Sequence, residues 1–142
     1  MRYLGLDLGT KTLGIAISDK SAILASFYKV LRHNENYSLL INELRKIIKE
    51  EKIEKIVLGM PKNMNNTLGP KAELSIKFKK DIEEKLGLEV ILEDERMTTV
   101  SAEKILLEGN KSRAKRKEII DGVAAQIILQ SYLDRKGVEN GK

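Results

Sequence analysis

The most informative stretch of the chain lies near its start and reads Tyr3-Leu4-Gly5-Leu6-Asp7-Leu8-Gly9-Thr10-Lys11-Thr12. Leucine at every second position predicts a half-buried strand over residues 2–8, and the other face of that strand ends in Asp7. Such a carboxylate needs a partner or a metal, because removing its water costs several kcal/mol. Gly9 and Thr10 then predict a tight turn whose backbone can approach a phosphate closely. The sequence therefore predicts a carboxylate at the end of a hairpin strand, next to a turn with room for a phosphate.

The bulk composition narrows the classes of protein that the chain can belong to. Its 142 residues predict a single domain, 1–142, and 42% hydrophobic with 33% charged residues predicts a folded, cytoplasmic protein. No apolar run approaches the roughly 20 residues that span a bilayer, and no signal peptide is expected. The absence of cysteine excludes disulfides and thiolate zinc sites. The single histidine, His33, argues against histidine-based catalysis and is expected on the surface.

Hydrophobic periodicity predicts an order of strands and helices along the chain. Strands are predicted at residues 2–8, 14–18, 23–31, 53–59 and 88–92, and helices at 37–48, 70–86, 99–108 and 117–136. The three early strands should pair antiparallel, and the two later ones should add in parallel through right-handed crossovers. The expected fold class is α/β, with a mixed five-stranded sheet and helices on both faces.

Acidic residues from three separate elements are candidates for one site. Asp7 ends the first strand, residues 93–95 end the fifth, and Asp121 is the only charge in the apolar window 119–129. A helix that is apolar nearly all round is buried, and the alanines and glycine beside Asp121 would let it lie close to the sheet. Carboxylates without histidine or cysteine suit one or two Mg²⁺ or Mn²⁺ ions, which can activate water in phosphodiester cleavage.

Each acid also has a structural interpretation. Asp7 could cap its turn, and Asp121 could be an acid near a helix start that the macrodipole favours. Alternation along a strand sends Asp94 to the face opposite Glu93 and Glu95. Only one or two of these three can therefore point into a site, and the others would be solvated or paired with Arg96.

Four motifs in order along the chain resemble one known family. They are Asp7-Leu8-Gly9-Thr10-Lys11-Thr12-Leu13-Gly14-Ile15-Ala16, Gly59-Met60-Pro61-Lys62-Asn63, Asp94-Glu95-Arg96-Met97-Thr98-Thr99 and Asp121-Gly122-Val123-Ala124-Ala125. The set resembles the YqgF/RuvX family of pre-16S rRNA nucleases, also described as Holliday-junction-resolvase-like proteins. The resemblance implies a ribonuclease-H-like fold. It also implies that Asp7, Glu95 and Asp121 are the catalytic, metal-binding acids, with Asp94 as the alternative to Glu95.

Basic and turn residues around these acids are candidates for nucleic-acid binding. Gly59 and Pro61 are expected to shape a strand end beside the metals, while Lys62 and Asn63 meet a phosphate; the alternative is an ordinary polar turn. Lys11 and Arg96 each lie beside a candidate acid and could hold phosphates or form ion pairs.

A basic segment precedes the last helix and is expected to be a loop tethered near the site. Its positive residues are Lys111, Arg113, Lys115, Arg116 and Lys117. Such a run is often only a solvated loop, but its position and the net charge of +5 favour phosphate binding.

The predicted function is that of a metal-dependent nuclease, a hydrolase acting on ester bonds. The resemblance implies structured RNA as the substrate, with the 5′ end of pre-16S rRNA being matured in ribosome biogenesis. A Holliday junction resolvase is the alternative and would require a two-fold dimer. A catalytically idle rRNA-binding assembly factor is another. A monomer or weak homodimer without membrane attachment is expected.

Overall fold

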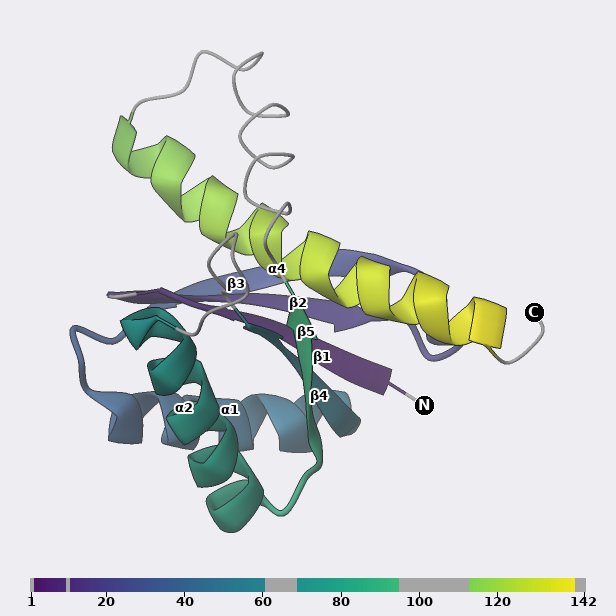
Figure 1. Cartoon of the computed structure of the whole chain (residues 1–142), viewed down its shortest axis with the longest axis horizontal. Helices are drawn as coiled ribbons and strands as arrows, with labels where there is room; N and C mark the ends of the chain where they lie inside the picture. The colour runs from purple at the N-terminus through teal and green to yellow at the C-terminus, as the bar shows by residue number, and fades with distance from the viewer. Residues whose placement is uncertain (1, 10, 61–68, 95–112, 140–142) are drawn as a thin grey trace.

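The computed structural model describes residues 2–9, 11–60, 69–94 and 113–139, with the backbone alone for 70–71, 94, 113–121 and 137–139. The described elements follow in chain order (Figure 1): β1 (Arg2–Leu8), β2 (Thr12–Ser18), β3 (Ala25–Arg32), α1 (Tyr37–Glu51), β4 (Ile53–Met60), α2 (Pro70–Leu86), β5 (Val90–Asp94) and α4 (Arg113–Glu139). None of the described helices is long and apolar enough to cross a membrane.

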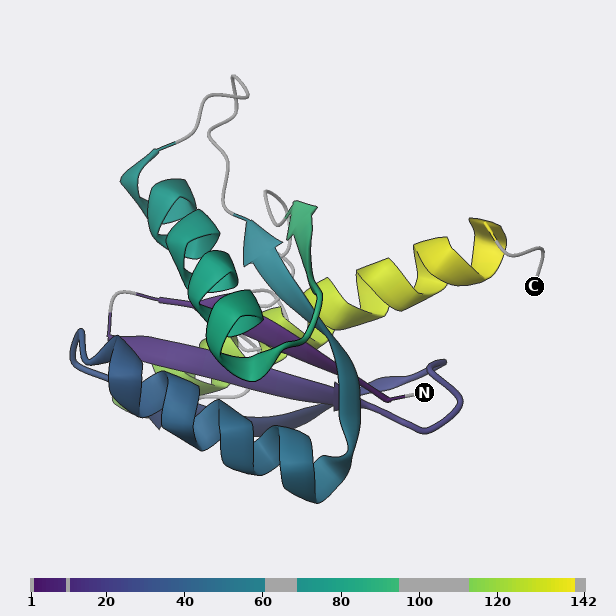
Figure 2. The same ribbon diagram turned by 90° about the horizontal axis from the view of Figure 1, so that it is seen from below.

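The strands form one mixed sheet in the order β3-β2-β1-β4-β5. β2 pairs antiparallel with both β1 and β3, whereas β4 pairs in parallel with β1 and β5. Helices α1 and α2 cover one face of the sheet, and α4 crosses the other (Figures 1 and 2). The predicted topology is therefore confirmed, and β1, which carries Asp7, is its central strand.

The two faces of the sheet bury different kinds of side chain. The face under α1 and α2 is leucine- and isoleucine-rich, and β1 contributes Leu4, Leu6 and Leu8 to it. The face under α4 is built from Tyr3, Ala16 and Val57 of the strands, with small and branched residues of α4. β1 is thus buried on both faces rather than on one, because α4 covers the side that the sequence pattern left open.

Helix α4 lies unusually close to the centre of the sheet. A Cβ atom built on Gly5 would be 2.6 Å from Leu129 Cβ and 3.0 Å from the Ala125 carbonyl oxygen. A Cβ atom on Gly122 would be 1.9 Å from Phe27 Cε2. The prediction that glycine and alanine near Asp121 allow a close approach is confirmed, and Gly5 supplies the matching gap on the sheet.

Several element boundaries differ from the prediction for local reasons. α4 begins at Arg113, so residues 113–116 are helical instead of forming a loop. Lysine, arginine and alanine are strong helix formers. β3 begins at Ala25 because the Asp19 carboxylate accepts hydrogen bonds from the two preceding amides, in a turn before the strand. β5 begins at Val90, after Gly87 ends α2 with φ of 70°. The helix predicted at 99–108 lies outside the described residues.

Candidate functional site

Asp7 lies on the face of the sheet that α4 covers, and it is half-buried. Its partner across the antiparallel ladder is Gly14 of β2. On the other side Leu6 pairs with Leu58 of β4, so Gly59 is the next residue beside Asp7. Because both flanking positions are glycines, neither neighbouring strand places a side chain against this carboxylate. The two strands beside β1 therefore contribute no side chain at the positions next to Asp7.

Glu93 continues the same row across the sheet, since it pairs with Gly59 in the β4–β5 ladder. Leu92 packs on the α1–α2 side, so alternation puts Glu93 on the α4 side. Its side chain is buried, and Oε1 accepts a hydrogen bond from Arg135 Nη1 of α4 at 2.6 Å. Within the described part of the chain, Oε2 is buried without a hydrogen-bond partner.

The Glu93–Arg135 pair was missed by the sequence interpretation, which left the remaining acids of residues 93–95 solvated or paired with Arg96. The partners are 42 positions apart, so no local spacing signals the contact. A second tie lies nearby, where Lys136 Nζ donates a hydrogen bond to the Tyr3 hydroxyl of β1. That bond is the main reason why the pKa of Lys136 is raised above its ordinary value. These two contacts link the C-terminal part of α4 to β5 through Glu93 and to β1 through Tyr3.

We expect Arg135→Ala to destabilise the protein by about 2 kcal/mol in urea unfolding. Removing one partner of a buried pair costs about 3–5 kcal/mol, but the Arg135 side chain is 51% exposed and that of Glu93 5%, which lowers the figure. Adding Glu93→Gln should recover most of the loss, because a neutral amide is easier to bury than an unpaired carboxylate. A loss of less than about 0.5 kcal/mol for Arg135→Ala alone, which is typical of surface substitutions, would contradict the assignment.

Asp121 belongs to α4, and its backbone lies one residue before the close contact between Gly122 and Phe27. One turn later Ala125 touches Gly5, two residues before Asp7 in β1. The backbone positions of Asp7, Glu93 and Asp121 therefore belong to one side of the sheet. For Asp121, and for Asp94 at the end of β5, the structure describes the backbone alone.

The turn between β1 and β2 is closed by backbone hydrogen bonds and by His33. Gly9 N donates to the Thr12 carbonyl at 2.8 Å, and His33 N donates to the Lys11 carbonyl at 2.9 Å. The Lys11 side chain is exposed. His33 itself is 1% exposed, so the prediction of a surface position was wrong. The polar loop after β3 curls inward because both imidazole nitrogens find backbone partners there.

The remaining predicted residues fall into two groups. Some lie outside the described residues: Thr10, Pro61, Lys62, Asn63, Glu95, Arg96 and Lys111. Others are described by their backbone alone, in the first turns of α4: Arg113, Lys115, Arg116 and Lys117. Among the described residues no group of three acidic, histidine or cysteine side chains could hold a metal. The full set of predicted ligands therefore stays a prediction.

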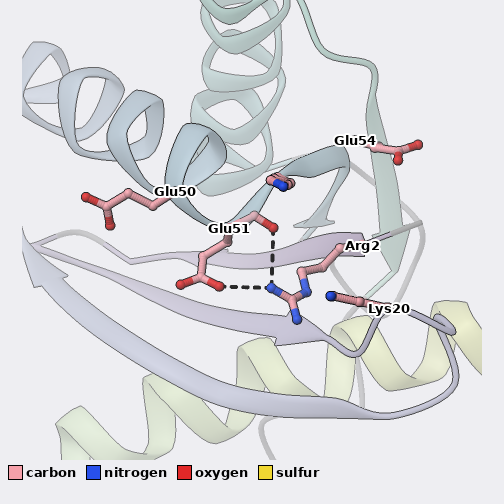
Figure 3. Close-up of a pocket in the computed structure, with 6 residues that line it drawn as sticks. Arg2, Lys20, Glu50, Glu51 and Glu54 are labelled. Carbon is pink, nitrogen blue, oxygen red and sulfur yellow. Dashed lines mark hydrogen bonds and ion pairs between the residues drawn. The ribbon is translucent and has the colours of Figure 1, made fainter.

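A separate cavity of about 370 Å³ lies at the other end of the strands, where β1 and β4 begin (Figure 3). Its lining is Arg2, Lys20, Glu50, Glu51, Lys52 and Glu54. Arg2 Nη1 lies 2.9 Å from Glu51 Oε2, so its charge is already paired. With three acids and three bases the lining carries no net charge, and it does not favour a polyanion.

The fold is the ribonuclease-H-like fold of RuvC-type resolvases. RuvC of T. thermophilus, solved in complex with a Holliday junction substrate, aligns with a TM-score of 0.61 over 96% of each chain at 16% identity. The fowlpox virus Holliday junction resolvase aligns with a TM-score of 0.59 over 96% of this chain and 99% of its own, at 14% identity. At these identities the likeness concerns the fold alone.

Sequence similarity then gives the family. The family described as "RuvX: Holliday junction resolvase" matches residues 1–135. A protein of Oenococcus oeni is 49% identical over 139 residues, 96% of each chain. One of Clostridium botulinum is 51% identical over 135 residues, 95% of this chain and 98% of its own. Both are named "Putative pre-16S rRNA nuclease". This chain belongs to the RuvX family, and the resemblance carried by its four motifs is confirmed.

Proposed function

We propose that this chain is a metal-dependent nuclease that hydrolyses phosphodiester bonds in the 5′-end maturation of pre-16S rRNA. The observation that carries the proposal is the setting of Asp7, which lies on the central strand between Gly14 and Gly59. In that arrangement neither neighbouring strand contributes a side chain next to the carboxylate, on the side of the sheet that α4 covers. The names of the relatives, about half identical over nearly the whole chain, support RNA processing as the role.

Asp7, Glu95 and Asp121 are the proposed metal ligands. Glu95 is favoured over Asp94 because it stands two residues after Glu93, which lies on the Asp7 side of the sheet, and strand alternation has a period of two. His33 is not a candidate ligand, since both of its ring nitrogens already have hydrogen-bond partners. An all-oxygen donor set suits Mg²⁺ or Mn²⁺. When bound there, one or two such ions would supply activation of a water and stabilisation of the leaving 3′-oxygen.

The chain's basic residues are proposed to hold the nucleic acid. The exposed Lys11 ammonium follows Asp7 by four residues and can bind a phosphate oxygen next to the cleaved bond. Arg113, Lys115, Arg116 and Lys117, in the first turns of α4, lie close before Asp121 in the helix that carries it. Phosphate contacts of this kind position the substrate and weaken as salt rises. The protein would act as a single domain in the cytoplasm, as a monomer or weak homodimer.

The alternative substrate is a four-way DNA junction. It is supported by the description of the family, which names a Holliday junction resolvase. Symmetric cutting of a junction requires two sites related by a two-fold axis, so that activity would depend on a dimer.

Cleavage of end-labelled RNA is the experiment that tests the proposal. The protein is incubated with a pre-16S RNA fragment spanning the mature 5′ end, and in parallel with a four-way DNA junction, in Mn²⁺ or in EDTA. We expect RNA cleavage in Mn²⁺ that EDTA abolishes. Symmetric junction cutting with intact RNA would replace the proposal by the resolvase. RNA binding without cleavage of either substrate would replace it by the assembly factor.

A further inference from the structure

The single histidine of the chain joins two loops that are far apart in sequence. His33 follows β3 directly, and its ring lies 3.0 Å through Nε2 from the Gly9 carbonyl oxygen, 24 positions away. Its backbone N–H donates to the Lys11 carbonyl at 2.9 Å. His33 therefore binds two carbonyl groups of the β1–β2 turn, one on each side of residue 10. That turn begins two residues after Asp7 and carries Lys11.

The second ring nitrogen determines which tautomer can make these contacts. The backbone N–H of Glu35 donates to Nδ1 at 2.9 Å, so Nδ1 must present its lone pair. The proton of a neutral imidazole then resides on Nε2 and is donated to Gly9. Asn34 and Glu35 have φ of 45° and 68°, a left-handed conformation that is unfavourable for residues with a side chain. The loop thus accepts unfavourable backbone geometry while holding the ring in one orientation.

The outer side of the ring is also supported. The centroids of His33 and Tyr37 are 5.2 Å apart, and Tyr37 in turn lies 6.3 Å from Phe78. Tyr37 begins α1 and Phe78 belongs to α2, so the imidazole rests on the helical layer while it reaches the turn. The imidazole is thus packed against the ring of Tyr37 while its Nε2 contacts the Gly9 carbonyl oxygen.

We propose that His33 is a positioning residue for the nuclease site, which holds the β1–β2 turn so that Asp7 and Lys11 keep a fixed relation to the cleaved phosphate. The inference rests on the proposed function. It requires the Nε2–H to Gly9 hydrogen bond itself and not only a ring of suitable size. His33 does not touch substrate in this scheme, and it acts through Lys11 and the strand end.

Two substitutions separate the hydrogen bond from the packing of the ring. His33→Gln places an amide donor near the position of Nε2, whereas His33→Asn places an oxygen near Nδ1 and leaves Gly9 without its donor. We expect His33→Gln to cleave RNA within about threefold of the parent and His33→Asn to be about tenfold slower, the loss of one neutral hydrogen bond. Each protein is assayed well below its own thermal midpoint.

A double-mutant cycle with Lys11→Ala supplies a readout that a purely structural role would not give. If His33 acts by placing Lys11, His33→Asn should cost less than about threefold in the Lys11→Ala background, because coupled residues are not additive. Nitrogen NMR of the unaltered protein should also show the proton on Nε2, a measurement that needs no variant to fold.

The possible results separate a failure of the proposed nuclease function from a failure of the proposed role of His33. Failure of the unaltered protein to cleave would overturn the proposed function and this inference with it. Cleavage by the unaltered protein with equal rates for His33→Gln and His33→Asn would overturn the inference alone. A proton on Nδ1, or fully additive losses in the cycle, would do the same.

Discussion

Asp7→Asn should abolish metal-dependent cleavage, with a loss of about 10³-fold or more, while the protein stays folded. The substitution removes one negative charge and one strong metal-binding oxygen, and an ion that stabilises the transition state by several kcal/mol is then held poorly. A loss of about 4 kcal/mol corresponds to three orders of magnitude in rate. Asparagine has nearly the same shape as aspartate, so the flanking glycines and the sheet register should be unaffected.

The rate is measured with the end-labelled RNA over a range of Mn²⁺ concentrations. Asp81→Asn is the matched control, since Asp81 belongs to α2 on the opposite face of the sheet. It makes the same chemical change away from the proposed site and should cleave like the parent. Asp7→Asn cleaving at the parent's rate would mean that Asp7 is only a turn residue, which was the structural interpretation of this position.

The second large effect is expected from Gly5→Ala. The added methyl would meet Leu129 Cβ at 2.6 Å and the Ala125 carbonyl oxygen at 3.0 Å, and neither is the end of a flexible side chain. Helix α4 must therefore move away from β1. Overpacking of this kind costs about 1–3 kcal/mol, and the contact with backbone puts the figure near the upper end. For a chain of 142 residues that is roughly 10 °C in thermal midpoint.

Cleavage should fall as well, because the displaced helix is the one that carries Asp121. A shift of about 1 Å in a catalytic group can cost about 10²-fold. Gly87→Ala is the contrasting variant: Gly87 has φ of 70° with nothing within 4 Å of an added Cβ. It should lose about 1–2 kcal/mol from backbone strain and keep its cleavage rate. If Gly5→Ala matched the parent in both measurements, the close approach of α4 would be wrong.

Local sequence patterns were sufficient for most of the fold. Alternating leucines in β1 and the proline and glycine that bound α2 are short-range signals, and the order of elements then leaves few topologies for the sheet. The basic run before Asp121 was misread as a loop because its charge suggested solvation, although its residues are strong helix formers. The amphipathic pattern alone does not mark where such a helix begins.

The sequence predicted the candidate site only where a single residue is recognisable from its neighbours in the chain. Asp7 stands out as an acid in an apolar strand, and the structure adds what the sequence could not show, the glycines beside it on both neighbouring strands. The burial of His33 and the pairing of Glu93 with Arg135 depend on contacts 24 and 42 positions apart. Contacts of that range have no sequence period, so they follow from the folded sheet and not from any local motif.

Helix α4 is synthesised last, so the face of the sheet that it covers stays exposed during most of the synthesis of the chain. The candidate acids Asp7 and Asp121 are 114 positions apart, about 6 to 23 seconds of synthesis at 5–20 residues per second. β1, β2, β3 and β4 can pair long before α4 emerges, but Tyr3, Ala16 and Val57 then have no helix packed over them. A nascent chain would thus offer an apolar surface to chaperones while it lacks one of its proposed catalytic acids. We expect the nuclease to remain inactive until α4 has packed against the sheet.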